Sequence, residues 1–194
     1  GKTSQMALLV DFLTREGYTI LATREPGGTE IGSQLRSVIV SLRNTGMLPT
    51  TEILLFQASR AQLVGQVIRP HLEGGGIVIS DRYGDSTLAY QGYGYQNQLA
   101  SLRQLVDFAT GGLKPDLTLL LDLDVETGLK RRMQAGSVNR LDVLGVDFYQ
   151  RVRQGYLEMA RAEPQRWVII DAAPAFEEVQ AALRAVVLAR LGRA

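Results

Sequence analysis

Ile77-Val78-Ile79-Ser80-Asp81-Arg82 decides the fold, because a short apolar run ends directly in two charged residues. Successive β-branched residues after a glycine-rich turn at 74–76 predict a buried strand. Asp81 and Arg82 then lie at the carboxyl end of that strand, where open α/β sheets bind their ligands. The hydroxyls, amides and aromatics of the residues that follow favour recognition of a polar, planar ligand over closure of a core.

Helical and strand patterns alternate along the rest of the chain. Helices are expected at 3–16, 30–43, 51–72, 98–110, 125–135, 147–161 and 175–191, strands at 18–23, 77–80, 117–123 and 167–171, and a broken helical stretch at 85–92. This alternation predicts a parallel sheet with helices on both faces. With 194 residues, 45% of them apolar, the chain is expected to form one domain over 1–194.

Composition excludes several classes of protein. The formal net charge of +1 argues against general binding to nucleic acid or to membrane surfaces. No apolar run is long enough to predict a membrane span. The chain has no cysteine and a single histidine, which excludes a disulfide framework and any thiolate or imidazole-rich metal site.

Gly1-Lys2-Thr3-Ser4 contains the second half of the phosphate-binding pattern G-x-x-x-x-G-K-[ST]. In that pattern backbone N–H groups and a helix N-terminus hold phosphates, the lysine reaches the β/γ oxygens, and the threonine hydroxyl binds Mg²⁺. Three residues recur by chance, so an ordinary chain start is the alternative. The helix and then the strand expected directly afterwards are the order that the pattern requires.

The same pattern requires a central buried strand before its glycines. Loss of five or six apolar side chains of such a strand, at ~1.5–3 kcal/mol each, would remove roughly 10 kcal/mol. That energy is comparable to the net stability of a whole domain. We therefore expect about ten further residues before Gly1 in the native protein.

Five further motifs occur in order along the chain. They are Thr23-Arg24-Glu25-Pro26-Gly27-Gly28, Leu55-Phe56-Gln57-Ala58-Ser59-Arg60, Asp81-Arg82-Tyr83 with Ser86-Thr87-Leu88-Ala89-Tyr90-Gln91, Pro115-Asp116-Leu117-Thr118 and Asn139-Arg140-Leu141-Asp142. With these motifs the chain resembles the bacterial thymidylate kinases, and the resemblance covers essentially the whole chain. It implies a three-layer P-loop kinase fold with five parallel strands, and transfer of the γ-phosphoryl group of ATP to dTMP with Mg²⁺. It also implies a cytoplasmic homodimer.

The resemblance places the pyrimidine against two motifs. Phe56 and Arg60, which share one helix face, are expected to stack on the base and to bind its carbonyl oxygen. The alternative for this pair is a core Phe and a surface Arg. Thr87 and Gln91, also four residues apart, are expected at the N3–H/O4 edge. Tyr90 is expected to crowd the sugar, unless it is a half-buried ring whose hydroxyl bonds the backbone.

The acceptor phosphate is expected to contact Arg36 and Arg82, beside the Glu25-Pro26 loop. Phosphoryl transfer is catalysed mainly by positioning and charge neutralisation. Lys2, Mg²⁺, Arg82 and an arginine of a lid are therefore expected to spread the charge of the transition state.

The resemblance implies that Mg²⁺ lies on Thr3. Asp81 and Glu25 are candidates to hold the ion through water, because Mg²⁺ keeps several waters. Glu25 has an alternative role as a cap for the helix that begins near Thr29.

A polar segment at 136–142 lies between two helices and is expected to belong to a lid spanning about 133–146, although a plain surface connection is the alternative. Arg140 ranks first as the arginine that reaches the transferred phosphoryl group, and Arg132 ranks second. Arg131 is expected to stack on adenine. The backbone near Ala173, after the last strand, is expected to flank adenine as well.

Two other functions fit parts of this pattern. Another nucleoside monophosphate kinase would share the phosphate-binding start, the Asp-Arg pair and the lid, but Thr87 and Gln91 favour thymine. A nucleotide-binding module without catalysis would need no arginine clamp for an acceptor phosphate. The helices at 51–72 and 98–110 carry apolar residues in excess, which either a two-fold interface or neighbouring helices would bury.

Overall fold

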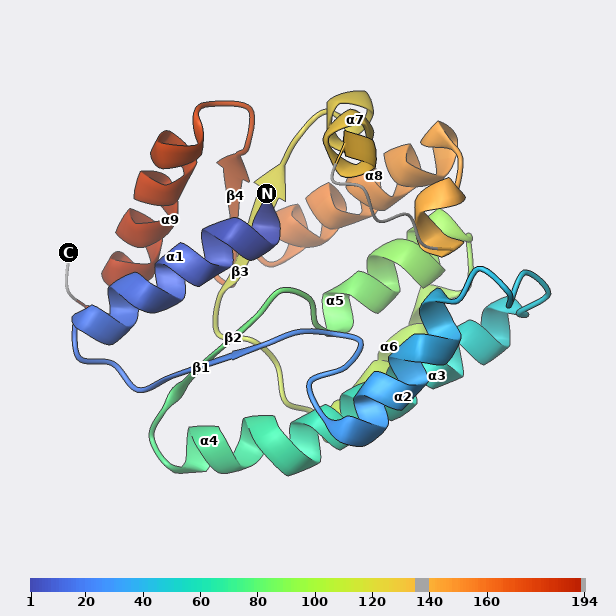
Figure 1. The fold of residues 1–194 in the computed structure, drawn as a ribbon, viewed down its shortest axis with the longest axis horizontal. Helices are drawn as coiled ribbons and strands as arrows, with labels where there is room; N and C mark the ends of the chain where they lie inside the picture. Colours follow the sequence, from blue (N-terminus) through green and yellow to red (C-terminus); the bar gives the residue numbers. More distant parts are fainter. Residues whose placement is uncertain (135–139, 193–194) are drawn as a thin grey trace.

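Helices and strands alternate in the order expected from the sequence (Figure 1). A computed structural model describes residues 1–134 and 140–192. The elements are α1 (Lys2–Arg15), β1 (Ile20–Thr23), α2 (Glu30–Val40), α3 (Pro49–Leu63), η1 (Val64–Ile68), α4 (Arg69–Glu73), β2 (Ile77–Ser80), α5 (Gly84–Thr87), η2 (Leu88–Gly94), α6 (Leu99–Thr110), β3 (Thr118–Asp122), α7 (Val125–Gln134), η3 (Arg140–Val143), α8 (Val146–Ala162), β4 (Trp167–Asp171) and α9 (Phe176–Arg190). The predicted helices and strands are confirmed, with their ends shifted by a few residues.

The four strands form two separate parallel pairs. β1 pairs with β2, with Ile20 opposite Ile77, and β3 pairs with β4, with Thr118 opposite Trp167. Within residues 1–134 and 140–192 no strand joins the two pairs. The predicted parallel pairing is thus confirmed. The single five-stranded sheet is not formed by these residues, because the two pairs are not hydrogen-bonded to each other.

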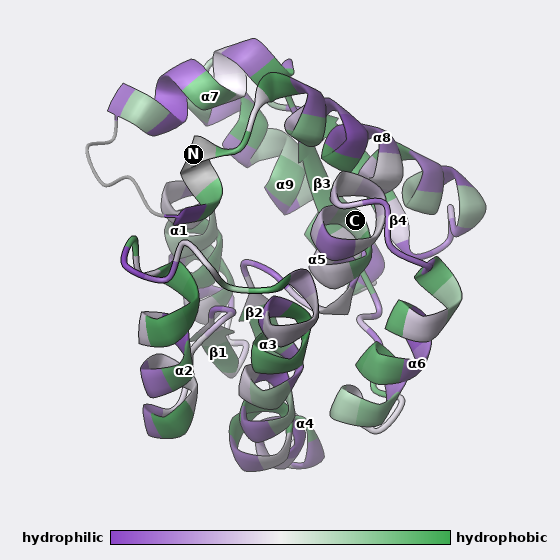
Figure 2. Cartoon of the chain, turned by 90° about the vertical axis from the view of Figure 1, so that its right-hand side faces the viewer, coloured by the Kyte–Doolittle hydropathy of each residue, from purple (hydrophilic) through white to green (hydrophobic). Residues whose placement is uncertain are grey.

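Helices pack on the strands in distinct groups. α1 and α9 lie side by side, and α8 contacts β3 and β4 (Figure 1). α2, α3 and α6 stand next to one another as a second group (Figure 2). In the described part of the chain, no helix combines the length and the apolar content needed to cross a membrane.

The stretch predicted as one helix over 51–72 is helical from Pro49 to Glu73 but is not a regular α-helix throughout. Residues 64–68 form a π-helical turn between α3 and α4. A second π-helical segment, η2, follows α5 and occupies the stretch predicted to be broken. π-Helical turns are found frequently at functional sites, and η2 carries two of the predicted substrate-binding residues, Tyr90 and Gln91.

Thr29 caps α2, and Glu25 does not. The Thr29 side-chain oxygen accepts a hydrogen bond from the backbone N of Gly32 at 2.9 Å, and Thr29 has an extended backbone. A side-chain oxygen at this position satisfies one of the free N–H groups of the first turn. The alternative role of Glu25 as the cap is therefore wrong.

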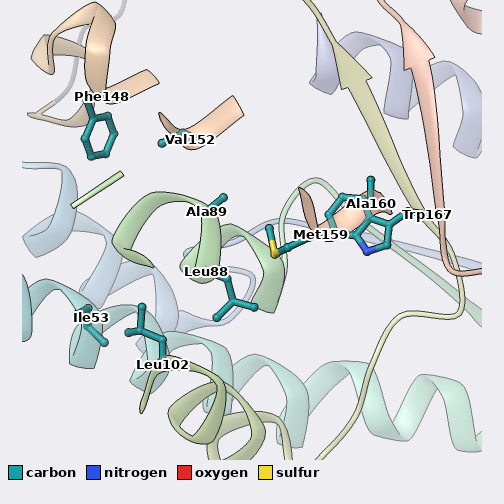
Figure 3. Close-up of a cluster of buried hydrophobic side chains, with 9 residues drawn as sticks. All are labelled: Ile53, Leu88, Ala89, Leu102, Phe148, Val152, Met159, Ala160 and Trp167. Carbon is teal, nitrogen blue, oxygen red and sulfur yellow. The ribbon is translucent and has the colours of Figure 1, made fainter. Parts of the chain in front are cut away.

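The largest apolar cluster joins α3, η2, α6, α8 and the start of β4 (Figure 3). Its buried members are Ile53, Leu88, Ala89, Leu102, Phe148, Val152, Met159, Ala160 and Trp167. Leu88 and Ala89 begin the η2 segment, so this cluster holds the predicted base-binding residues against the rest of the protein.

Candidate active site

Asp81 and Arg82 leave β2 at its carboxyl end, and Lys2 lies within range of both charges. The Asp81 Oδ1 atom accepts a hydrogen bond from the backbone N of Glu25 at 3.2 Å, which ties this end of β2 to the loop after β1. The pKa of Lys2 is lowered to about 8, first by the positive charge of Arg82 and next by desolvation, with a further lowering by Arg132 and an opposing effect of Asp81. The fold thus brings three cations and one carboxylate from distant parts of the chain to one place.

Two tyrosines hold the guanidinium of Arg82. Its Cζ atom lies 4.7 Å from the centre of the Tyr90 ring, and its Nη2 donates to the Tyr90 hydroxyl at 3.0 Å. Its Nη1 donates to the hydroxyl of Tyr156 at 3.5 Å. The Tyr156 hydroxyl in turn lies 2.8 Å from the hydroxyl of Ser86. Tyr90 is half-buried, as in the alternative given for it, but the partner of its hydroxyl is Arg82 and not the backbone.

Tyr156 of α8 is a site residue that sequence patterns do not single out. Phe148, Val152 and Tyr156 recur at helical spacing, which indicates only a face packed on the core. Burial raises the pKa of Tyr156 to about 12, so its hydroxyl keeps its proton near neutral pH. The role of this hydroxyl can be recognised only from the folded structure, in which Arg82 lies beside it.

Arg60 lies within α3, with 2% of its surface exposed. Its Nε and Nη2 donate to the carboxylate of Glu25, the shortest contact being 2.6 Å from Nη2. Nη2 also donates to the carbonyl oxygen of Tyr83, while Nη1 donates to Gln57 Oε1 and Thr87 Oγ1. All five N–H donors of the guanidinium therefore have acceptors.

This arrangement differs from the predicted pair of Phe56 and Arg60 on one open face. Phe56 is half-buried, but Arg60 is ion-paired inside the protein, so the alternative of a surface Arg is wrong. A buried cation needs a counter-charge and full hydrogen bonding, and Glu25 supplies the charge. Burial raises the pKa of Glu25, and the charge and hydrogen bonds of Arg60 oppose that rise. Both carboxylate oxygens of Glu25 thus face Arg60, which leaves Asp81 as the better candidate for Mg²⁺.

Thr87 and Gln91 are both buried, and each has a partner on α3. The Thr87 hydroxyl oxygen accepts from Arg60 and from Gln57 Nε2, which leaves its hydrogen to be donated. Gln91 Nε2 donates to Glu52 Oε1 at 2.8 Å. Sequence reasoning missed Glu52, although Glu52, Phe56 and Arg60 follow one another at intervals of four residues and so share one helix face.

Arg36 of α2 lies over the loop after β1. Its Nη1 donates to the carbonyl oxygen of Pro26 at 3.1 Å, and the backbone N of Gly27 donates to Ser59 Oγ at 3.0 Å. A Cβ atom on Gly32 would lie 2.8 Å from the carbonyl oxygen of Gly27, so α2 packs this closely on the loop only because residue 32 is glycine. The loop predicted to line the acceptor phosphate is therefore held from two sides.

Arg140, which was expected to reach the transferred phosphoryl group, is ion-paired with Glu52 of α3. Its Nη2 lies 2.5 Å from Glu52 Oε2, and its Nε donates to the carbonyl oxygen of Ile39 at 3.0 Å. Its charge is thus paired with a buried carboxylate on α3, so a role as the catalytic lid arginine would require its release from Glu52. Residues 135–139 of the predicted lid lie outside the described residues.

The other two arginines near the lid lie closer to their expected places. Arg131 donates from Nη1 to the carbonyl oxygen of Ala172 at 3.1 Å, in the loop after β4. In the same loop the backbone N of Ala173 donates to Asp171 Oδ1. Arg132 acts on the pKa of Lys2. Arg131 thus contacts the loop that contains Ala173, and Arg132 lies within electrostatic range of Lys2.

The start of α1 is suited to bind an anion. Gly1 is its N-cap, Thr3 and Ser4 are exposed in the first turn, and no acidic residue occupies that turn. Free N–H groups and the positive end of the helix dipole attract phosphate. The Thr3 hydroxyl and the Asp81 carboxylate are hard oxygen donors, so the residues present fit Mg²⁺.

A phosphate-binding helix start, an Asp-Arg pair at the end of a parallel strand and a set of converging arginines define the class of P-loop nucleotide kinases. Comparison with known families narrows this class. The model of the family described as thymidylate kinase matches residues 1–183, and the chain belongs to that family.

Curated relatives agree with the family match. A thymidylate kinase of Deinococcus radiodurans is 47% identical over 190 residues, which cover 98% of this chain and 92% of the relative. A thymidylate kinase of Synechococcus sp. is 50% identical over 191 residues, with 98% and 90% covered. One of Roseiflexus sp. is 45% identical over 199 residues, with 96% and 88% covered.

Proposed function

We propose that the protein transfers the γ-phosphoryl group of ATP to dTMP, which yields dTDP and ADP for nucleotide biosynthesis. The observation that carries the proposal is the convergence of Lys2, Asp81 and Arg82 in a chain of the thymidylate kinase family. The amide of Gln91 and the hydroxyl of Thr87 follow on the same segment and match the polar edge of a pyrimidine.

The proposal is tested by ADP release with ATP·Mg²⁺ and each of dTMP, dUMP, UMP, dCMP and thymidine. Strong preference for dTMP supports it. Preference for dCMP or for thymidine would instead identify another nucleotide or nucleoside kinase. Binding of ATP without turnover of any acceptor would indicate a binding module.

In the proposed reaction the acceptor oxygen of dTMP attacks the γ-phosphorus in line with the leaving ADP oxygen. Lys2 binds the β/γ oxygens, and Arg82, held by Tyr90 and Tyr156, neutralises charge on the phosphates between donor and acceptor. Arg36 and the Pro26 loop hold the acceptor phosphate. Mg²⁺ would be bound by Thr3 and, through water, by Asp81, and it would neutralise charge on the β- and γ-phosphates.

The base would lie between Phe56 and the polar side chains of η2. Gln91 and Thr87 offer an amide and a hydroxyl to its edge, and Tyr90 crowds the sugar. Arg60 contacts the carbonyl oxygen of the base only if one of its present acceptors gives way. Arg131 and the backbone at Ala173 flank the adenine of ATP.

We assign the catalytic cation of the lid to Arg132, because Arg140 is neutralised by Glu52. Arg132→Ala is expected to lower the turnover number about 10–100-fold, with little change in the KM for dTMP, since the lost charge acts mainly in the transition state. Arg131→Ala is the matched control and should raise the KM for ATP instead. Full turnover by the Arg132→Ala enzyme would return the role to Arg140.

The lowered pKa of Lys2 predicts uptake of protons when ATP binds. At pH 8 about half of the free protein carries a neutral Lys2, whose pKa is about 8 and not the ordinary 10.5. Phosphate oxygens favour the charged ammonium and raise the pKa again, so binding should take up roughly half a proton per site. Calorimetry of MgATP binding in two buffers of different ionisation enthalpy measures this uptake.

Lys2→Arg provides the control for this measurement, because a guanidinium stays charged throughout. Its proton uptake at pH 8 should fall to near zero. Uptake should also vanish for the unmodified protein well below pH 8, where Lys2 already carries its proton. An equal uptake by both proteins at pH 8 would assign the proton to another group.

We further propose a homodimer that uses α2, α3 and α6. These neighbouring helices carry exposed apolar side chains, namely Ile31, Val38, Leu54 and Phe108, the last 89% exposed. A two-fold interface would remove this apolar surface from water. Sedimentation equilibrium measures the mass, and a monomer at micromolar concentration would contradict the dimer.

We also propose a fifth parallel strand between β2 and β3, within a single P-loop kinase domain whose lid spans about 133–146. Two observations support it. Among the described residues, β2 and β3 each have an edge without a neighbouring strand. Ile77, Val78, Leu119 and Leu120 are only half-buried, although their apolar sequence predicts burial. Hydrogen exchange of the enzyme tests this strand, since fast exchange throughout β2 and β3 would exclude such a neighbour. We place the enzyme in the cytoplasm, where its substrates occur.

A further inference from the structure

Glu52 is a buried carboxylate, 1% exposed, that the proposed transfer mechanism does not use. It lies on α3, one turn before Phe56. One of its oxygens accepts from Gln91 Nε2 at 2.8 Å, and the other lies 2.5 Å from Arg140 Nη2. Glu52 thus connects a base-binding side chain with Arg140 of the predicted lid.

The chemistry of a carboxylate decides how Gln91 is oriented. A Gln amide has an acceptor oxygen and a donor nitrogen of nearly the same shape, so the amide can bind in either of two orientations. An ionised carboxylate only accepts hydrogen bonds. Next to Glu52 the NH₂ group must therefore face α3, because the reversed amide would place oxygen against a negative charge. Arg140 compensates the charge that would otherwise be buried alone.

The orientation of an amide distinguishes the two kinds of pyrimidine. Thymine and uracil present an N3–H donor beside a carbonyl acceptor, whereas cytosine presents an N3 acceptor beside an amino donor. An amide oxygen fixed opposite N3 accepts from the N3–H of thymine or uracil and opposes the bare N3 acceptor of cytosine. An amide that is free to turn can match both.

We propose that Glu52 is a positioning residue that makes the enzyme select thymine and uracil over cytosine by fixing the orientation of the Gln91 amide. The inference rests on the proposed function, since it requires Gln91 to read the base. Ile53 directly follows Glu52, Leu88 lies three residues before Gln91, and both belong to one buried cluster (Figure 3). This cluster packs α3 against η2, the two elements that carry the Glu52–Gln91 contact.

Glu52→Gln tests the proposal, because the new amide can either donate or accept and no longer fixes Gln91. We expect the ratio of kcat/KM for dTMP to kcat/KM for dCMP to fall about tenfold or more. The ratio of dTMP to dUMP should not change, since both bases have the same edge. The KM for ATP should not change either. Glu52→Asp, which keeps the charge, should retain more of the selectivity than Glu52→Gln.

A double-mutant cycle shows whether Glu52 acts through Gln91. In a Gln91→Ala background, Glu52→Gln should cause no further change in the dTMP to dCMP ratio. If Glu52→Gln folds poorly, Glu52→Gln with Arg140→Gln removes both charges together and tests the same ratio. Asp85→Asn is the matched control, since it breaks another shielded carboxylate–arginine pair, with Arg166, and should lower thermal stability without changing the ratio.

Two results would overturn the inference. An equal loss of activity toward dTMP, dUMP and dCMP in Glu52→Gln would leave Glu52 a purely structural role. A further fall in selectivity when Glu52→Gln is added to Gln91→Ala would show that Glu52 does not act through that amide. Failure of the unmodified enzyme to phosphorylate dTMP would refute the proposed function, which is a separate result.

Discussion

Arg82→Ala is expected to lower the turnover of dTMP roughly a hundredfold or more while ATP still binds. The guanidinium is held by the ring and hydroxyl of Tyr90 and by the hydroxyl of Tyr156, so its position is set before substrate arrives. Its charge also acts strongly on Lys2. In the proposed site it neutralises charge that develops on the phosphates, and alanine cannot replace this. Single-turnover kinetics and calorimetric titration with ATP measure the two effects.

Arg69→Ala is the matched control for this variant. Arg69 is a partly buried arginine whose Nη2 donates to the carbonyl oxygens of Thr110 and Gly111, outside the site. Its loss is expected to lower stability but to leave turnover nearly unchanged. If Arg82→Ala turns over within about threefold of the unmodified enzyme, Arg82 has no part in transition-state stabilisation.

Arg60→Met is expected to lower the free energy of unfolding by about 3–5 kcal/mol at pH 7. The substitution removes the partner of Glu25 and leaves a buried carboxylate without a counter-charge. Burial already raises the pKa of Glu25, and Arg60 opposes that rise. Without Arg60 the pKa rises further in the folded protein, so the folded state binds a proton more tightly than the unfolded state. The stability deficit should therefore shrink as the pH falls from 7 toward the ordinary range of a carboxyl group.

Urea unfolding at pH 7 and at pH 5.5 measures this deficit and its pH dependence. Arg153→Met is the control, because Arg153 is 42% exposed in its pair with Asp122. This substitution should lower the free energy of unfolding by less than about 1 kcal/mol. A loss of similar size in both variants would show that burial adds nothing to the Arg60 pair. A deficit that grows as the pH falls would show that Glu25 is not the group left unpaired.

Local patterns predicted the order of helices and strands and the position of Asp81 and Arg82 at a strand end. These predictions hold because hydrophobic periodicity, glycine turns and strand ends are properties of short segments. Five strands in one sheet were expected from the resemblance to thymidylate kinases and not from these patterns, which predict four. The four that are described form two pairs, because pairing depends on which strand lies alongside and not on the sequence of each strand alone.

The partners of the buried charges could not be derived in this way. Arg60 meets Glu25 across 35 residues, Arg140 meets Glu52 across 88, and Arg82 meets Tyr156 across 74. A sequence pattern shows that an arginine is present and on which helix face it lies. It does not show which carboxylate is buried opposite, because that depends on how the helices pack.

The sequence by itself determined the element order, the phosphate-binding start at Lys2 and Thr3, and the family to which the chain was expected to belong. Only the tertiary structure decided that Arg140 is bound to Glu52, that Arg60 lies inside the protein, and that Tyr156 holds Arg82. The physical reason is the cost of burying charge. Each buried cation or carboxylate must find a partner in the folded core, and distant segments supply that partner.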